Sequence, residues 1–233
     1  MKLNDLLVQL AQGELSNLSM AASGEIKPDS HAKVILAINS ALRDIFSRVP
    51  LAQKEVLIQT LDWKSVYHLR VEHSKLNPTP GYLKYILDMP NDRFTGDVVK
   101  VLGVTNEVGD PLPINDAEQW ASVFFPAFDT VQFNHPGAGQ VFSVQYQALH
   151  DVLKTSGDGY LDQEIRIPAV LEDMVKIRTA YNIIAPMGGQ DQTIKAQALD
   201  AMYEGRHTSL VLNNDAGDTG VSTNVKLLLR GYP

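Results

Sequence analysis

The chain has 233 residues, 44% of them apolar, which is enough to bury the core of one domain or of a helical body with an inserted module. With 20 basic and 27 acidic residues its formal charge is −7, which argues against a surface that grips nucleic-acid phosphates. It contains no cysteine, which excludes disulfides and thiolate metal sites. We expect a soluble protein of a reducing compartment, without a signal peptide or a membrane-spanning segment of about 20 apolar residues.

Two amphipathic helices are predicted near the N-terminus. The first has a leucine stripe that something else must bury, formed by Leu3, Leu6, Leu7 and Leu10. The second is predicted to follow an N-cap at Ser30 and to stop at Pro50. Its apolar face should pack against the helix that begins at Pro168, and this face includes Ile38, Leu42, Ile45 and Phe46.

The middle of the chain reads as short β-strands. Glu55–Leu61 and Ser65–Val71, separated by Asp62–Lys64, are predicted to form a hairpin. Further apolar or alternating runs predict strands at Val98–Val104, Phe124–Phe125, Val131–Phe133 and Val141–Tyr146. A glycine-bearing turn at Asn106–Asp110 and a loop at Asn134–Gly139 separate these runs.

Helices return after this β-region. One should open at Pro168 and extend to about Pro186, and apolar residues on more than one side place it between two neighbours. A last helix is expected from Asp191 to near Gly205. The remainder contains a polar linker, Asn213–Gly220, and the apolar run Val225–Leu229.

These elements predict an α+β fold. We expect a helical bundle body (1–50 and 162–206), an inserted antiparallel β-sheet or sandwich module (51–150) and an extended C-terminal arm (207–233). The arm's apolar side chains are the expected interface with a partner protein or a neighbouring subunit, namely Val211, Val225, Leu227, Leu228, Leu229 and Tyr232. The other interpretation of this segment is a final strand that completes the monomer's own sheet.

A search for chemistry in the sequence finds no catalytic motif and no metal site. His68 and His73 would point to opposite faces of a strand, so they could not converge on one ion. Ser156–Gln163 resembles part of a calcium loop, but the required first and last carboxylates are replaced by Lys154 and Ile165. This segment is better interpreted as a glycine-rich turn. No cofactor is expected.

Taken in order, the segments resemble one family. After the N-terminal helix pair come β-strands, a Val-x-Val-x-Gly-Val segment, a turn and an aromatic-proline segment, which is Phe124–Pro126. A strand pair around Pro-Gly follows, then a Val-Gln-Tyr-x-Ala-Leu segment, which is Val144–Leu149, and an Ile-x-Ile-Pro entry to a long helix, which is Ile165–Pro168. The chain thus resembles the head-tail adaptor proteins of tailed bacteriophages, also described as connector or tail tubular ring proteins, over most of its length to about Gly205.

This resemblance implies a structural virion protein rather than an enzyme. The family forms a homo-oligomeric ring, commonly of twelve copies, that joins the capsid portal to the tail. The expected partners are therefore copies of the same chain, the portal protein and a tail or tail-completion protein. Double-stranded DNA would pass through the channel without specific binding, and no membrane is involved. The expected location is the virion neck, after assembly in the host cytoplasm.

Other functions stay open at this point. One is a β-sandwich module that binds a carbohydrate or a surface receptor, with Trp63, Trp120 and Tyr82 as stacking groups. Another is a hydrolase whose residues converge only in three dimensions. A third is a different tail-completion protein, such as a tail terminator.

Overall fold

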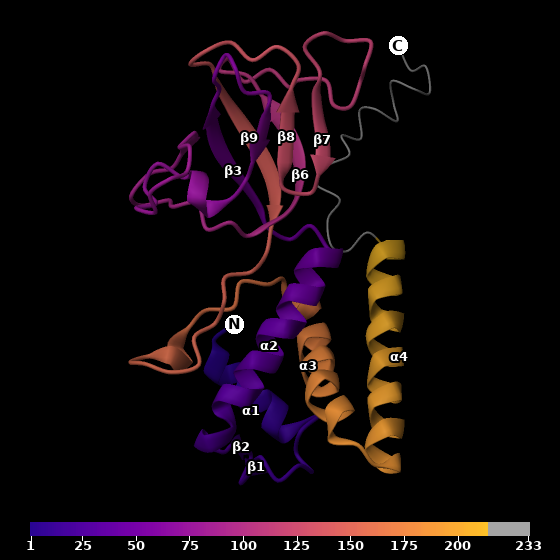
Figure 1. The fold of residues 1–233 in the computed structure, drawn as a ribbon. Coiled ribbons are helices and arrows are strands. Elements are labelled where there is room, and N and C mark those ends of the chain that lie inside the picture. The colour runs from indigo at the N-terminus through magenta and orange to yellow at the C-terminus, as the bar shows by residue number, and fades with distance from the viewer. Residues whose placement is uncertain (214–233) are drawn as a thin grey trace. The chain divides into compact units, whose positions relative to one another are not determined.

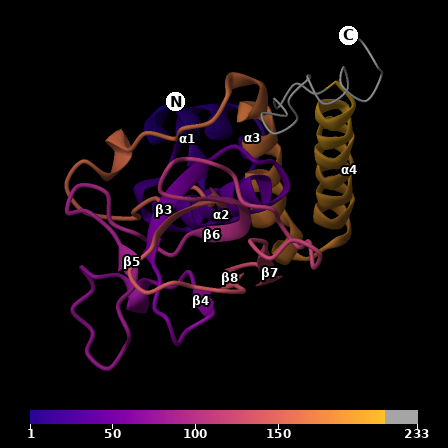
Figure 2. The same ribbon diagram turned by 90° about the horizontal axis from the view of Figure 1, so that it is seen from above.

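The computed structural model describes residues 1–213, with side chains up to residue 210, and confirms the expected α+β class. The chain forms two compact units. Among the described residues, the helical unit contains residues 1–45 and 152–213, and the β unit contains residues 46–151. The expected first boundary, between residues 50 and 51, lies five residues after the observed one. The β module is expected to end at residue 150, one residue before its observed end, and the helical body to resume at residue 162, ten residues after Val152. The described residues form four α-helices and nine strands, which are labelled in Figure 1 except for β4 and β5, labelled in Figure 2.

The helical unit begins with α1 (Leu3–Gln12), whose leucine stripe is buried as the sequence predicts. A short hairpin, β1 (Ala21–Ala22) and β2 (Glu25–Ile26), turns through Ser23 and Gly24, which both have positive φ. Helix α2 (Pro28–Arg48) follows. The predicted burial of its apolar face is confirmed, because Ile38, Leu42, Ile45 and Phe46 are all nearly inaccessible.

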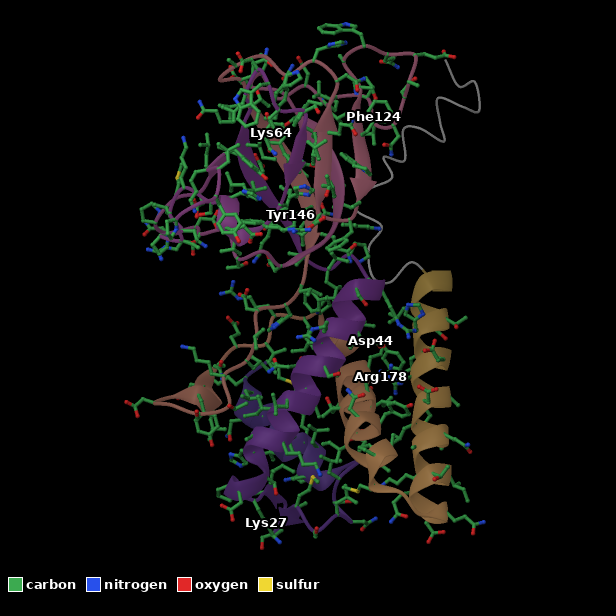
Figure 3. The ribbon with its side chains drawn as sticks, viewed as in Figure 1. Lys27, Asp44, Lys64, Phe124, Tyr146 and Arg178 are labelled. Atoms are coloured by element: carbon green, nitrogen blue, oxygen red, sulfur yellow. The ribbon has the colours of Figure 1, made fainter. Side chains whose placement is uncertain are left out.

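Helix α3 (Ala169–Ile184) lies between α2 and α4 (Gln190–Asn213), as both ribbon views show (Figures 1 and 2). The predicted burial of α3 on more than one side is confirmed. Asn182 of α3 donates to the carbonyl of Ala37 in α2 at 3.2 Å, and Arg178 of α3 points toward Asp44 of α2 (Figure 3). The unit also has 3-10 turns at Tyr160–Asp162 and Ala185–Met187.

Two predicted helix ends are wrong. Helix α2 begins two residues before Ser30, because Pro28 is preset for the first helical turn and the Ser30 amide donates to the carbonyl of Lys27 at 2.8 Å. Helix α4 continues through Gly205 to Asn213 instead of ending there. Leu210 is buried beyond Gly205, and this packing outweighs the cost of a glycine inside a helix, about 1 kcal/mol. The segment expected as an arm from residue 207 is therefore helical up to residue 213.

The β unit contains two antiparallel sheets with one core between them. The four-stranded sheet has the order β5-β3-β9-β6 and the three-stranded sheet has the order β4-β8-β7. Their strands are β3 (Gln53–Gln59), β4 (Val66–His68), β5 (Ile86–Leu87), β6 (Val98–Thr105), β7 (Val123–Ala127), β8 (Thr130–Phe133) and β9 (Val141–Ala148). A 3-10 turn at Val71–His73 follows β4. The predicted strands from residue 98 to 146 are thus confirmed.

The core of the β unit draws side chains from both sheets. Alternate residues of β3 and β9, such as Val56 and Val144, point inward and meet Tyr67, Val131 and Phe133 of the other sheet. The ring of Tyr67 contacts those of Tyr85 and Phe133 edge-on, at 5.0 and 5.6 Å between centroids. This apolar layer fixes the two sheets face to face.

The predicted hairpin of residues 55–61 and 65–71 is wrong. Strand β3 pairs with β5 and β9, whereas β4 pairs with β8 in the other sheet. The crossing lies at residues 60–64. There the Thr60 hydroxyl donates to the carbonyl of Gly137 at 2.6 Å, and the Tyr67 hydroxyl accepts from the Leu61 amide at 2.8 Å. These bonds hold the chain where it passes from the four-stranded sheet to the three-stranded sheet. Strands β3 and β4 are therefore adjacent in sequence but do not pair with each other.

Candidate interaction surfaces

Four loops of the β unit gather at one end of its sheets. Strands β3, β6 and β8 end there and β4, β7 and β9 begin there, since Gln59 pairs with Val141 and Val123 pairs with Phe133. The loops are residues 60–65, 106–112, 114–122 and 134–140. We call their outward side the loop-end surface; Lys64, labelled in Figure 3, lies in the first of them.

The loop-end surface exposes large apolar side chains. Trp63 is 71% exposed, Trp120 is 74% exposed and Val108 is 84% exposed. Both tryptophans of the chain are therefore in water at the same end of the unit. The same loops carry five carboxylates and one lysine, which are Asp62, Glu107, Asp110, Asp116, Glu118 and Lys64. This surface is both aromatic and acidic.

The conformations of these loops are fixed by their own hydrogen bonds. The Asn106 side chain accepts from the amides of Val108 and Asp110, at 3.0 and 2.9 Å. The Asn115 backbone has a positive φ of 54°, and its side chain accepts from the Phe125 amide at 3.0 Å. The Val141 amide donates to Glu107 at 2.8 Å and so ties one loop to the start of β9. The apolar tips are thus presented by ordered loops.

A small cavity of about 270 Å³ lies beside Trp120. Its lining includes Phe133, His135 and Phe142, and the ring of Trp120 lies 6.0 Å from that of His135, between centroids. An apolar floor with an indole and an imidazole at its rim can hold a small planar group or an inserted side chain.

A second cavity, of about 410 Å³, lies beside the edge of the four-stranded sheet and contains Lys54 and Tyr146. Burial disfavours the charged form of Lys54, but the Asp97 carboxylate at 2.7 Å raises its pKa above the usual 10.5. Burial, followed by the nearby Asp97 carboxylate, also raises the pKa of Tyr146. Both groups therefore keep their protons at neutral pH, so neither serves as a base here.

Residues His68, Thr130 and Asp129 resemble a nucleophile triad in composition but not in geometry. The Thr130 hydroxyl lies 3.0 Å from His68 Nδ1 and donates to Asp129 at 3.0 Å. In a triad the histidine lies between the hydroxyl and the carboxylate, whereas here the hydroxyl lies between the other two. Thr130 is buried, and Arg70 neutralises Asp129 at 3.0 Å. This cluster joins β4 to β8.

The remaining residues considered for metals have local partners. His73 Nδ1 bonds to the carbonyl of Leu83 at 2.9 Å, and its ring stacks on Tyr85. The Ser156–Gln163 turn is closed by the Gln163 amide, which bonds to both backbone groups of Lys154. Among residues 1–213 no group of three or more His, Asp or Glu side chains is arranged to hold a metal ion. None of the described helices has the length and apolarity needed to cross a membrane.

The structure bears on only part of the predicted interface. Val211 lies in α4, but its side chain is not described, and Val225, Leu227, Leu228, Leu229 and Tyr232 lie outside the described residues. Of the aromatic residues weighed from sequence, Trp63 and Trp120 share the loop-end surface. Tyr82 lies in a different loop against His73. Val108, the third exposed apolar residue of this surface, is not among the residues predicted from the sequence. Its signal there is an apolar side chain in the middle of the turn Asn106–Asp110.

Comparison with known proteins adds no relationship. No family model matches the chain, and a search of curated proteins finds no significant match.

Proposed function

We propose that this chain is a structural protein of a tailed-bacteriophage virion, not an enzyme. It acts as a head-tail adaptor, forming a homo-oligomeric ring of about twelve copies in the neck, where it joins the capsid portal to the tail. It assembles in the host cytoplasm and needs no cofactor. The observation that carries this proposal is the loop-end surface, where ordered loops present both tryptophans to solvent.

An exposed aromatic surface of this kind favours a protein partner. Clustered large apolar side chains mark interaction sites, and tryptophan is among the residues that contribute most to binding. The five carboxylates beside Trp63 and Trp120 favour a partner surface that is basic as well as apolar. A portal or a tail protein would provide it.

The order of elements supports the same assignment. The chain that forms the helical unit is interrupted by the β unit and returns through Ile165–Pro168 into α3, which is the order of the resembled family. The formal charge of −7 suits a channel through which double-stranded DNA passes without specific binding. A second interface would come from the apolar run Val225–Leu229, outside the described residues.

Electron microscopy of the purified full-length chain, with sedimentation velocity, tests the ring. Closed rings are expected, either of the chain alone or after addition of its portal protein. A chain that remains monomeric under both conditions would overturn the proposal. The double variant Trp63→Ala/Trp120→Ala should still form rings but lose attachment to portal or tail. Tyr82→Ala is the control, because it removes an exposed aromatic residue from another loop.

A second candidate is a carbohydrate-binding or receptor-binding module. It is favoured by the cavity beside Trp120 and His135, because sugars stack on exposed indole rings. A titration of tryptophan fluorescence with a panel of mono- and oligosaccharides distinguishes the two. Saturable quenching that Trp120→Ala abolishes, in a chain that forms no rings, would favour the module.

A further inference from the structure

The outer side of the four-stranded sheet carries an open groove of about 420 Å³. Strand β9 lies along it, between β3 on one side and the end of β6 with its following loop on the other. The side chains that point outward here alternate with the core residues of the same strands. We call this feature the sheet groove. Its uncharged lining includes Leu57, Thr105, Val108, Val141 and Ser143.

The sheet groove is acidic. Glu55 and Glu107 line it, and both residues are exposed. Glu107 accepts a hydrogen bond from the Val141 amide at 2.8 Å, which leaves its negative charge uncompensated. Within the described residues neither carboxylate forms an ion pair. Two such charges in one groove favour an occupant that carries cations.

The basic residues around the sheet do not line the groove, namely Lys54, Lys75, Arg93 and Lys100. Lys54 pairs with Asp97 at 2.7 Å, and Lys75 donates to Gln59 at 3.2 Å. Arg93 lines the second cavity instead. The two carboxylates of the groove are therefore left to a cation from outside the β unit.

Ser143 is a second, independent indication of an occupant. It is only 9% exposed, and the strand register places it on the outer side of the sheet between Leu57 and Thr105. Its hydroxyl has no hydrogen-bond partner among the described residues. Buried polar groups nearly always have a partner. A chain lying along β9 would bring backbone N–H and carbonyl groups to this hydroxyl.

The register of the strands sets the spacing of the acidic groups. Glu55 lies opposite Gln145 of β9, whereas Glu107 is bound at the amide of Val141. The two positions are four residues apart along β9, which is about 13 Å in an extended strand. Ser143 lies midway between them.

The chain has a segment with the complementary pattern, Val225–Arg230, which lies outside the described residues. Lys226 and Arg230 are also four residues apart, so an extended segment would place them about 13 Å from each other. The alternate residues would then form one apolar side, namely Val225, Leu227 and Leu229. Such a segment can lay this side in the groove while its long basic side chains reach the carboxylates at the rim.

Val108 favours one direction of the segment. If the segment runs antiparallel to β9, Lys226 reaches Glu55 and Arg230 reaches Glu107. Tyr232 then follows toward the loop at the end of β6, where Val108 is 84% exposed. The opposite direction matches the charges equally well but takes Tyr232 away from this apolar side chain.

The segment can reach a second copy of the chain. It is joined to the end of α4 by eleven residues, 214–224, which span at most about 40 Å, slightly more than the length of about 36 Å of α4 itself. A contact between two different surfaces of identical chains is head-to-tail, and such contacts close into rings.

We propose that Val225–Arg230 of one copy docks in the sheet groove of the next copy, antiparallel to β9. This rests on the proposed ring. It names the surface that receives the C-terminal segment.

A charge exchange in the full-length chain tests the pairing, under the conditions in which the parent chain forms rings. Glu55→Lys and Lys226→Glu should each raise the concentration at which rings form by about threefold or more, measured by sedimentation velocity. The double variant should return to the parent value, whereas Glu55→Lys/Arg230→Glu should not. Asp158→Lys is the matched control, because it makes the same change at an exposed residue of the helical unit.

Cysteine cross-linking tests which copy supplies the segment, because the chain has no cysteine of its own. The full-length variant Gln145→Cys/Val225→Cys, treated with a short bismaleimide, should give a ladder of covalent oligomers. A mixture of the two single variants should stop at covalent dimers. Asp158→Cys/Val225→Cys is the control and should give no ladder.

Three results would overturn the docking. A cross-link within one chain would place the segment on its own copy. Rings without a ladder, in which the charge exchange restores nothing, would show that the segment binds elsewhere, with the adaptor function intact. A parent chain that forms no rings, alone or with its portal protein, would overturn both proposals.

Discussion

Arg178 of α3 and Asp44 of α2 form the centre of a polar network inside the helical unit. Arg178 Nε lies 3.2 Å from Asp44 Oδ2, and the Tyr203 hydroxyl donates to the same oxygen at 2.8 Å. Arg178 Nη1 also pairs with Asp200 at 3.0 Å. The guanidinium lies over the rings of Tyr181 and Tyr203, at 4.8 and 4.9 Å from their centroids. One side chain thus connects α2, α3 and α4.

The substitution Arg178→Met should lower the free energy of unfolding by on the order of 2–3 kcal/mol, because it removes the partly buried ion pairs with Asp44 and Asp200 and the contacts with two tyrosine rings. Urea unfolding followed by circular dichroism measures this. The double variant Arg178→Met/Asp44→Leu should lose less than the sum of the two single variants. Arg166→Met is the control, since Arg166 pairs with Glu164 on the open surface, and an equal loss in both would contradict a special role for Arg178.

The substitution Leu42→Ala tests the core of the helical unit. Leu42 is fully buried on the inner face of α2, so truncation should cost about 2–5 kcal/mol through lost burial and a residual cavity. Val170→Ala on α3, where the residue is 46% exposed, should cost much less, about 0.5–1 kcal/mol. Equal stability of the two variants, measured by urea unfolding, would show that this face of α2 does not form the core.

Periodicity in the sequence predicted this core correctly because helical spacing reports burial directly. The face containing Ile38 and Leu42, and the strands around Val131 and Val144, repeat at the periods of the structures that they form. Partner choice has no such local signature. The runs 55–61 and 65–71 are adjacent in sequence and both apolar, yet they belong to different sheets. The pairing of each run depends on a distant strand, β9 for the first and β8 for the second.

Helix ends and exposed surfaces were less predictable for a related reason. Gly205 is a strong local stop signal, but burial of Leu210 five residues later keeps α4 helical. Leu36 and Met202 look like core residues from their type, but in the structure they are 61% and 53% exposed. Trp63 and Trp120 were named from sequence, while their position on the same end of the β unit depends on strand register.

The substitution Asp129→Asn tests an electrostatic contribution to the β unit. Burial would raise the pKa of Asp129, but Arg70 and Thr130 bond to its carboxylate and hold the pKa below the ordinary 3.8. A carboxyl whose folded-state pKa is depressed stabilises the fold above its unfolded pKa. That contribution is lost as pH falls below about 3.8 and through the folded value.

The variant should therefore lose on the order of 1–3 kcal/mol at pH 7 and show a flatter decline in stability below about pH 4. Melting temperatures measured from pH 7 down to pH 2 would show both effects. Asp62→Asn is the control, because it removes an exposed carboxylate from the loop-end surface. Its melting temperature should fall with pH in the same way as that of the parent chain. If the melting temperature of Asp129→Asn falls with pH as steeply as that of the parent chain, Asp129 does not contribute to the loss of stability in acid.

Truncation of the chain tests the proposed C-terminal interface, and the structure determines where to cut. A stop after Asn213 removes Val225–Leu229 and Tyr232 but leaves α4 whole, whereas a stop after Ser209 also removes the buried Leu210. The first truncation should change stability by less than about 0.5 kcal/mol and abolish ring formation or co-sedimentation with portal-bearing capsids. The second should also cost about 1.5–3 kcal/mol, because it removes the burial of one leucine.

Replacing Leu227 and Leu228 by Asp in the full-length chain provides the matched control, and it should reproduce the loss of attachment without shortening the chain. A stop after Asn213 that lowers the melting temperature by several degrees would instead show that the last residues complete the monomer's own fold, and normal attachment to capsids would exclude an interface there.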